Sequence, residues 1–530
     1  MKHLNKFHAL LIAFVLSITG TLTAQIKQGE FIINGSNIDS PNKIIETKNG
    51  EFLIAGQTDK YGLGGGDAYI NKLDSKGGLK WSTAIGGTKY EWAADIIETS
   101  DNKYLAVGTT DSYGAGTENV YVIKLDTNGN IIWTKTIGGT MYDEGASICQ
   151  TSDKGFMITG NTDSYGKGFP DVYIIKLDSN ANLQWTKTIG NNGNDRGLFI
   201  SQLKDKDFII GATTNSYGAG NYDFYVIRFD SLGNLKWTKT IGGSGMDKAS
   251  SMIVTADNGY AIAGYTNSYG VGGNDIYVVK LDSNGNLQWT KTIGGKKDDY
   301  GDEIIQTNDN GYFIGGATFS YGDTTNGSIY LVRLDSNGNL KWTKTINGTR
   351  NGVGCRVLKT SDNGFMIGGN IYGTYNGIDI IKLDSNGNGC SGVNSAGGSV
   401  GSGGVVLSGG VMSTGGGGVS TGGISSSGGN ETIICQVMGL RDITSLLKSV
   451  EISPNPSKGI FSFKIANSYL IPELHVCIYN VLGKSVFNQT FQQAKNDFQI
   501  DLSGQPSGVY FYQVTSEQEE LVANGKLVKE

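Results

Sequence analysis

The sequence has very little histidine, proline, cysteine and charge for its 530 residues. Its three histidines are His3, His8 and His475, so the long middle of the chain has no imidazole for a general base, a catalytic triad or a histidine-bound metal. We therefore assign no catalytic residue, expect neither cofactor nor metal, and do not expect an enzyme. Charged residues make up 17%, the formal net charge is -6, and basic residues form no block. Nucleic acid is accordingly not expected as a partner.

Long apolar runs are also missing, since none reaches the roughly 20 residues of a membrane-spanning helix. Lys2 and Lys6 precede a short apolar run that begins at residues 9–15 and ends near Ala24. This pattern is typical of a secretory signal peptide, which we place at residues 1–24. A retained membrane anchor is the alternative. We expect the mature chain to have no transmembrane segment.

Cysteine is scarce as well, and the five cysteines leave at least one unpaired. Cys390 and Cys435 flank a glycine-rich stretch. They could close that stretch as a loop in an oxidising compartment. Whether they pair is left open.

Glycine, in contrast, is abundant, with 81 residues, and most of it recurs with a fixed period. Trp81, Trp133, Trp185, Trp237, Trp289 and Trp342 are separated by 52, 52, 52, 52 and 53 residues. One unit, residues 250–294, contains strand-like runs at 252–255, 260–265, 276–282 and 287–293, with Asn-Gly turn signals after the first and third. Four antiparallel strands in about 50 residues, repeated, predict the blades of a β-propeller.

The number of blades follows from counting each strand type. The second and third strands of the unit occur seven times, whereas the Trp strand occurs six times. Residues 30–35 end in Asn-Gly, as do residues 345–348, so an N-terminal strand can complete the last blade and close the ring. We predict an all-β, seven-bladed propeller of four-stranded antiparallel blades over residues 25–390. An open solenoid is the rival fold.

The repeat also resembles known families. The phrases Lys-Leu-Asp-Ser-Asn-Gly-Asn-Leu-Gln-Trp, Ile-Gly-Gly, Asp-Asn-Gly-Tyr and Ala-Gly-Tyr-Thr are similar to those of bacterial β-propeller repeat proteins. The resemblance covers residues 30–388, although it departs from the commonest form in its Trp strand and its Ser-Tyr-Gly loop. It implies the propeller fold and no single activity.

The chain after the repeats changes composition twice. Residues 391–430 are almost wholly Gly, Ser, Val, Thr and Ala, which predicts a flexible linker, because so little apolar surface cannot offset the ordering entropy. Residues 431–449 would be a connector. Strand-like runs between residues 459 and 515 then predict a small C-terminal β-sandwich over residues 450–530.

This last domain carries four short motifs in order: Pro-Asn-Pro-Ser-Lys-Gly, Tyr-Asn-Val-Leu-Gly-Lys, Leu-Ser-Gly and Pro-Ser-Gly-Val-Tyr. They resemble the Por secretion system C-terminal sorting domain of the type IX pathway of Bacteroidetes-like bacteria. The resemblance implies Sec export, handling by the type IX machinery, and a secreted or outer-membrane surface location. An ordinary terminal binding sandwich is the alternative. The residues that carry the motif are Pro454, Asn455, Pro456, Gly459, Gly483, Gly508, Tyr510 and Lys526.

The propeller offers one repeated candidate for binding. A tyrosine stands in the long second-to-third-strand loop of every blade, at Tyr61, Tyr113, Tyr165, Tyr217, Tyr269, Tyr321 and Tyr372. These loops and the interblade loops share one face, and tyrosine suits sugar or protein surfaces. We interpret the tyrosines as ligand-binding. The alternative is that each packs against the neighbouring blade.

Two other repeated motifs have structural explanations. Glu91, Asp143, Asp195, Asp247 and Asp299 recur after the interblade Gly-Gly turns, and we interpret them as turn residues that accept from backbone N–H groups. The Asp-Ser-Asn-Gly-Asn turns look superficially like calcium loops but lack the distal Glu. We predict a surface binding or adhesion scaffold for a glycan or protein; the alternative is a polysaccharide hydrolase or lyase that uses carboxylates on the loop face.

Overall fold

A computed structural model represents the whole chain. It describes residues 26–35, 39–168, 170–346, 350–371, 377–389, 393–395, 399–401, 405–407, 411–414, 418–420, 424–427, 430–438, 450–465, 473–480, 484–492, 497–516 and 521–530. Every regular element in these ranges is a strand. The chain divides into a unit of Lys27–Val437 and a second unit that contains Met438–Glu530. The predicted signal peptide lies outside the described residues.

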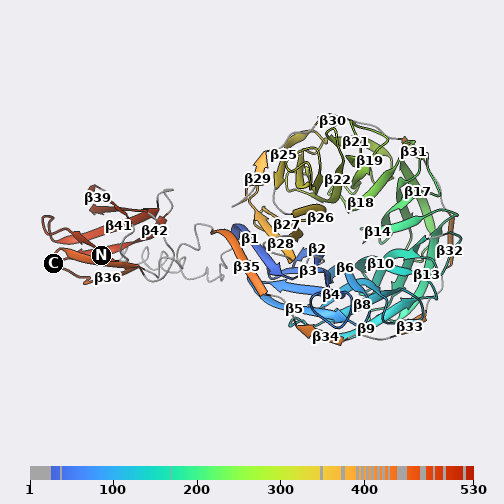
Figure 1. Cartoon of the computed structure of the whole chain (residues 1–530), viewed down its shortest axis with the longest axis horizontal. Coiled ribbons are helices and arrows are strands. Elements are labelled where there is room, and N and C mark those ends of the chain that lie inside the picture. The colour runs from blue at the N-terminus through green and yellow to red at the C-terminus, as the bar shows by residue number, and fades with distance from the viewer. Residues whose placement is uncertain are drawn as a thin grey trace, which may run out of the picture. The chain divides into compact units, whose positions relative to one another are not determined.

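The first unit is a ring of seven antiparallel sheets, which confirms the seven-bladed propeller (Figure 1). In chain order from the channel outward, blade 1 contains β2 (Ser40–Glu46), β3 (Phe52–Thr58), β4 (Asp67–Leu73) and β5 (Leu79–Gly86). Blade 2 contains β6 (Glu91–Glu98), β7 (Tyr104–Thr110), β8 (Asn119–Leu125) and β9 (Ile131–Gly138). Blade 3 contains β10 (Asp143–Gln150), β11 (Phe156–Thr162), β12 (Asp171–Leu177) and β13 (Leu183–Gly190). Blade 4 contains β14 (Asp195–Gln202), β15 (Phe208–Thr214), β16 (Asp223–Phe229) and β17 (Leu235–Gly242).

The remaining blades repeat the same order. Blade 5 contains β18 (Asp247–Val254), β19 (Tyr260–Thr266), β20 (Asp275–Leu281) and β21 (Leu287–Gly294). Blade 6 contains β22 (Asp299–Gln306), β23 (Tyr312–Thr318), β24 (Ser328–Leu334) and β25 (Leu340–Ile346). Blade 7 contains β26 (Arg350–Lys359), β27 (Phe365–Ile371), β28 (Gly377–Leu383) and, from the N-terminus, β1 (Ile26–Asn34).

The N-terminal strand closes the ring as the repeat count predicts. β1 pairs antiparallel with β28, with Phe31 opposite Ile380 and Ile33 opposite Ile378. The side chains of Phe31, Ile32 and Ile33 are buried. Blade 7 therefore joins the two ends of the repeat array in one sheet, and this pairing removes the open edge that a solenoid would leave.

The recurrent tryptophan of one blade packs against the Asn-Gly turn of the next blade. Trp237, on the fourth strand of blade 4, lies against Gly285 in the turn of blade 5. Gly285 has a φ of 78°, and an added Cβ would lie 2.9 Å from the indole of Trp237. Glycine is thus required twice, by the backbone conformation and by the close approach of the ring. Both residues recur in most repeats, and their contact joins one blade to the next.

The glycine-rich segment differs from the flexible linker expected of it. Seven short strands, here called the belt, each add a fifth strand to one blade. They are β29 (Val393–Ser395), β30 (Ser399–Gly401), β31 (Val405–Leu407), β32 (Val411–Thr414), β33 (Gly418–Ser420), β34 (Ile424–Ser427) and β35 (Asn430–Met438). The belt visits blades 6, 5, 4, 3, 2 and 1 in turn and ends beside β1 in blade 7 (Figure 1).

The physical reason for this difference is main-chain pairing. The belt strands β29 to β34 each pair antiparallel with the outer edge of a blade, as where Val406 lies opposite Ile241 and Val400 opposite Ile293. Backbone hydrogen bonding to an open edge does not need large side chains, and composition alone gave no sign of it. The strands begin six or seven residues apart. At about 3.3 Å per residue, six residues span about 20 Å, so one hexapeptide leads from each blade to the next.

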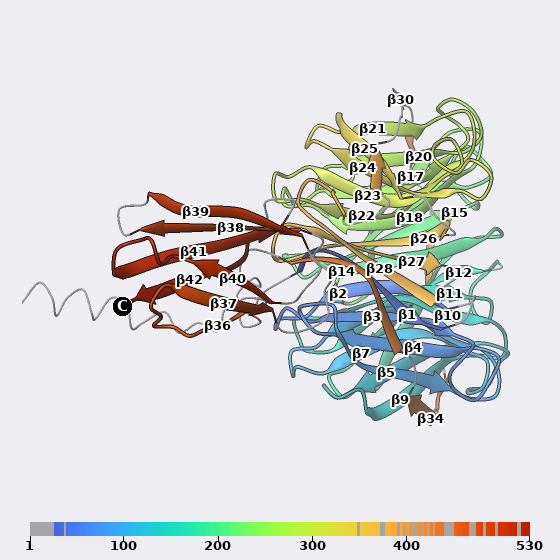
Figure 2. The same ribbon diagram turned by 60° about the vertical axis from the view of Figure 1, so that its left-hand side comes forward.

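The second unit is the predicted small β-sandwich. One sheet contains β36 (Val450–Ser453), β37 (Ile460–Ile465) and β40 (Asp497–Asp501). The other contains β39 (Ser485–Gln492), β38 (Glu473–Asn480), β41 (Gly508–Ser516) and β42 (Leu521–Lys529), side by side in that order (Figure 2). Phe461, Phe463, Ile478 and Val514 lie in the shared core. Cys390 and the side chain of Cys435 lie outside what the structure describes, so their pairing stays a prediction.

Candidate functional site

The innermost strand of every blade contains a β-bulge, and the residue after each bulge lines the central channel. Bulges re-aim side chains, and in each blade the residue after the bulge is one of those that line the channel. These seven equivalent positions, here called the channel ring, are Lys43, Asp95, Ser147, Phe199, Ser251, Glu303 and Arg356. At these positions the blades carry two cations, two carboxylates, two serines and one phenylalanine, whereas the turns and the outer strands repeat closely.

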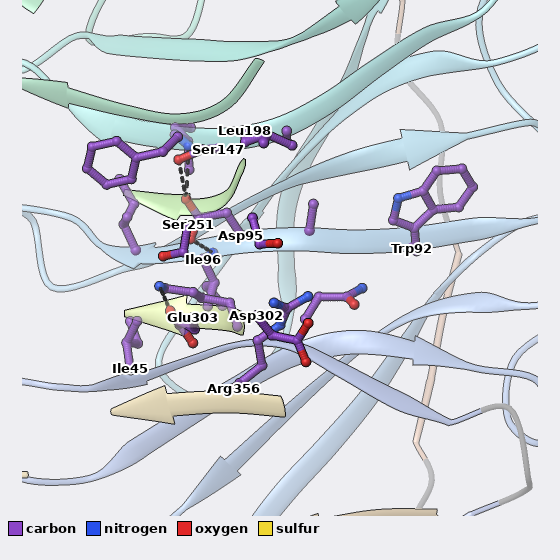
Figure 3. Close-up of a pocket in the computed structure, with 18 of the residues that line it drawn as sticks. Ile45, Trp92, Asp95, Ile96, Ser147, Leu198, Ser251, Asp302, Glu303 and Arg356 are labelled. Atoms are coloured by element: carbon purple, nitrogen blue, oxygen red, sulfur yellow. Dashed lines mark hydrogen bonds and ion pairs between the residues drawn. The ribbon is translucent and has the colours of Figure 1, made fainter. Parts of the chain in front are cut away.

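The channel ring borders a cavity of about 700 Å³. The charged members lie on blades 6, 7, 1 and 2, and Asp302 adds a second carboxylate beside Glu303 (Figure 3). The opposite arc is neutral, with Phe199 and Leu198 on blade 4. The cavity therefore has one charged side and one mostly apolar side, which is the usual make-up of a site that orients a small polar ligand.

The acids of the channel ring are already hydrogen bonded by the fold. Asp95 accepts from the hydroxyl of Ser147 at 2.9 Å and from the N–H of Ile148 at 3.0 Å, both on blade 3. Glu303 accepts from the N–H of Val357 on blade 7 at 2.9 Å, and Lys43 contacts its other oxygen at 2.6 Å. These acids therefore link neighbouring blades as well as lining the channel.

Burial and the charges of neighbouring residues shift the pKa values of Asp95 and Lys43. Burial raises the pKa of Asp95, and the nearby Lys43 ammonium and the hydrogen bonds from Ile148 and Ser147 only partly oppose it. Burial acts to lower the pKa of Lys43, but the charges of Glu303 and Asp95 outweigh it and hold that pKa above its usual value. Lys43 is thus a fixed cation at neutral pH.

The tyrosines predicted to bind ligand are half-buried and engaged with the fold. Tyr113 donates to the carbonyl of Gly86 at 3.0 Å, and its ring centroid lies 6.1 Å from that of the buried Tyr121. Tyr165, Tyr217, Tyr269 and Tyr321 repeat both contacts, and Tyr61 repeats the ring contact with Tyr69. Tyr372 lies outside the described residues. The hydroxyls bridge to the preceding blade, and a binding role stays a prediction.

The recurrent acids act as turn residues, which confirms that interpretation. Asp143 accepts from the N–H of Gly139 at 2.6 Å and from the hydroxyl of Ser164 at 2.7 Å, and it is fully buried. Glu91, Asp195, Asp247 and Asp299 accept from the matching backbone N–H groups. In the Asp-Ser-Asn-Gly-Asn turn, Asp282 accepts from the N–H groups of Asn284 and Asn286, each at 2.8 Å. Within the described residues, no group of three or more candidate metal ligands gathers.

The loop face also holds acids that the repeat pattern hid. Glu118 lies in the long loop of blade 2, and burial together with Glu144, Asp111 and Asp163 raises its pKa to about 7. One oxygen of Glu118 and one of Asp111 are buried without a hydrogen-bond partner in the described part of the chain. Equivalent positions carry Gly66 and Pro170 in place of Glu118, and Trp92 and Arg196 in place of Glu144. The signal that could have found these acids and the channel ring is divergence between otherwise matching repeats.

The sorting motif joins the two ends of the C-terminal unit. The side chain of Asn455 donates to the carbonyl of Lys526 at 2.8 Å and accepts from the N–H of Val528 at 2.9 Å. Tyr510 is buried and donates to the carbonyl of Pro506 at 2.6 Å. Gly459 and Gly508 have positive φ, whereas Pro454 and Pro456 are exposed. Gly483 lies outside the described residues.

Two family models match the chain. Residues 451–530 match the secretion system C-terminal sorting domain, and residues 99–131 and 255–287 match a β-propeller described as a domain of unknown function (DUF5122). The protein is thus a β-propeller repeat protein with a type IX sorting domain. The sorting domain directs it through the type IX machinery to the cell surface or the extracellular space. No helix in the described ranges is long and apolar enough to cross a membrane.

The following relative and solved structures share at most 24% of their aligned residues with this chain. The chain is 24% identical over 271 residues to the regulatory protein FlaEY of Caulobacter vibrioides, a match to 46% of this chain and 27% of that protein. Among solved structures, an endo-1,5-alpha-L-arabinanase from Thermotoga petrophila matches 68% of this chain and 100% of its own at 12% identity and a TM-score of 0.27. A member of the DUF4221 family from Bacteroides vulgatus matches 72% of this chain and 98% of its own at 9% identity and a TM-score of 0.32.

These neighbours correct one expectation. We expected that the chain is not an enzyme, but endo-arabinanases are among the propellers that it is similar to. A shortage of histidine in the repeats was therefore not a sound reason to exclude catalysis, since carboxylates alone serve some hydrolases. At such low TM-scores the likeness assigns no reaction to this chain.

Proposed function

We propose that the propeller is a surface-displayed binding module that takes an extracellular ligand into its central channel. The observation that supports this most is the channel ring, where seven otherwise repeated blades carry Lys43, Asp95, Ser147, Phe199, Ser251, Glu303 and Arg356. Lys43, Asp95, Ser147 and Glu303 also hold neighbouring blades together, whereas no hydrogen bond between blades accounts for Phe199 and Arg356 among the described residues. A glycan or a protein segment is the ligand class, as the tyrosine-rich loop face also suggests.

The test is a glycan and cell-surface binding screen on the full mature chain, followed by Phe199→Asp. A charged side chain on the apolar arc should abolish binding of any ligand that enters the channel. Leu232→Asp is the matched control, because Leu232 is 73% exposed and lies outside the channel. Binding that survives Phe199→Asp unchanged would remove the channel as the site.

The acids around Glu118 support a second candidate function, hydrolysis of a polysaccharide on the loop face. A carboxyl with a pKa of about 7 is about half protonated at neutral pH and can act as a general acid, while Glu144 or Asp163 supplies the second carboxylate. Such an enzyme should release products from a polysaccharide panel and lose activity as the pH rises above about 7. Glu118→Gln should abolish release, and so should one of Glu144→Gln and Asp163→Asn, whichever removes the second carboxylate. Glu98→Gln, outside the cluster, should not.

A further inference from the structure

The charged side of the channel holds one cation, Arg356, that differs from its charged neighbours in its hydrogen bonding. Lys43 pairs with Glu303, and Asp95 is bonded to blade 3, as described above. Asp302 accepts from the N–H of Cys355 at 2.9 Å. Arg356 differs from all of these, because its Nε is buried and has no hydrogen-bond partner in the described part of the chain.

A guanidinium placed in this way is suited to an anion with two oxygens. Arginine presents its donors in a planar fork that matches a carboxylate, and it keeps its charge at every physiological pH. Lys43 occupies the equivalent position on the next blade, so a second cation stands beside Arg356 in the ring. Lys43 pairs with Glu303, and Arg356 supplies the donor fork for an incoming carboxylate. Asp95 and Asp302 are the other charged groups on this side of the channel.

The rest of the cavity restricts the kind of molecule that carries the carboxylate. Phe199, Leu198 and Ala146 line the opposite wall, and Trp92 lies on the same strand as Asp95 (Figure 3). Apolar and aromatic surface of this kind suits the C–H face of a sugar ring, while the serines at 147 and 251 offer hydroxyls to sugar hydroxyls. About 700 Å³ accommodates one or two sugar units.

We propose that the channel binds a uronic-acid unit of a polysaccharide, with its carboxylate on Arg356 and its ring against the apolar arc. This rests on the proposed binding function and names its ligand class. A neutral glycan would offer the Arg356 guanidinium no opposite charge in a partly desolvated channel. The site thus discriminates acidic from neutral sugars.

The experiment titrates the full mature chain with trigalacturonate and with its methyl ester, which has the same sugars without the charge. We expect the acid to bind at least tenfold more tightly than the ester. Arg356→Gln should remove that preference, Arg356→Lys should keep part of it, and Lys359→Gln, on the same strand outside the channel, should keep all of it. Equal melting temperatures would show that these variants are folded.

Different outcomes separate this proposal from the one it rests on. If neutral saccharides bind with an affinity that depends on Phe199 but not on Arg356, the channel binds ligand and the uronate assignment is overturned. If a peptide with a free C-terminal carboxylate binds through Arg356 and trigalacturonate does not, the assignment is likewise overturned. If no saccharide of either kind binds, the uronate assignment is overturned, and the proposed function fails as well only if the screen also finds no protein ligand that depends on Phe199.

Discussion

Lys43 and Glu303 form an ion pair of 2.6 Å across the arc of blade 7, although 260 residues separate them in the chain. Lys43 belongs to blade 1 and Glu303 to blade 6, and Glu303 also accepts from Val357 in the blade between them. Three blades around the ring closure are thus held together by one carboxylate. The same carboxylate lines the channel.

Replacing Glu303 by alanine should therefore destabilise the closure of the ring. The change leaves the Lys43 ammonium and the Val357 N–H without their partner, at a cost of about 2 kcal/mol once partial exposure of Lys43 is allowed for. Chemical denaturation followed by tryptophan fluorescence measures it. Lys341→Met, which breaks an exposed pair with Asp309, should cost less than about 1 kcal/mol. Equal losses in the two variants would contradict the role given to Glu303.

Stability should also depend on pH through Asp275. Burial, and then the neighbouring acids Asp299 and Asp298, raise the pKa of this buried carboxyl to about 6. The folded state holds its proton more tightly than the unfolded state, so the stabilisation is complete below about pH 4 and is lost as the pH rises towards 6. By itself the group makes the propeller up to about 3 kcal/mol less stable at pH 7 than at pH 4.

The chain supplies its own control for this titration. Blade 2 has Asn119 at the position of Asp275, and its amide donates to the carbonyl of Tyr113 at 3.2 Å. Asp275→Asn should flatten the dependence of melting temperature on pH between 4 and 7 and raise stability at pH 7. Asn119→Asp should steepen it. A pH profile that neither variant changes would show that Asp275 does not titrate in this range.

Tyr113 and Tyr217 test the two interpretations of the loop tyrosines. Tyr113→Phe and Tyr217→Phe each remove one hydroxyl that donates to a carbonyl of the preceding blade, so each should cost about 1 kcal/mol in the free energy of unfolding. If the tyrosines bind ligand, Tyr113→Ala with Tyr217→Ala should weaken binding while the protein remains folded. Unchanged affinity in that double variant would leave them a purely structural role.

The belt can be tested one blade at a time. Replacing Val405, Val406 and Leu407 by proline removes every backbone donor of β31. We expect amide hydrogen exchange in β17 of blade 4 to speed up by roughly tenfold or more, with the outer strands of the other blades unchanged. The same three-residue replacement at 442–444, outside the belt, should leave β17 protected. Unaltered exchange in β17 would mean that β31 does not pair with it.

The sequence was sufficient to predict the blades, because each one repeats the same strands and turns. It also predicted β1, because the missing seventh Trp strand demanded a substitute. It did not predict the belt, since its strands depend on main-chain pairing and use residues such as Val405 and Ser413 that have no distinctive pattern by composition. The Gly-Gly pairs that recur at intervals of six or seven residues were the available signal.

The candidate functional residues could not be predicted from the repeat, because they lie where the repeats differ. Repetition directed attention to Tyr113 and its equivalents, which hold blades together, whereas Arg356, Phe199 and Glu118 stand out only where repeats differ. Their surroundings depend on bulges and on contacts between blades far apart in sequence. No pattern within a single repeat could show that Lys43 meets Glu303.

The belt also changes what a cut in the chain would do. An extracellular protease that cleaves one interblade loop breaks the covalent path around the ring at that point. Outside the ring, however, a second run of the same chain crosses the boundary between those blades and is paired to the sheets on both sides. The two fragments of the nicked protein therefore stay associated, because belt strands of one fragment remain paired with blades of the other.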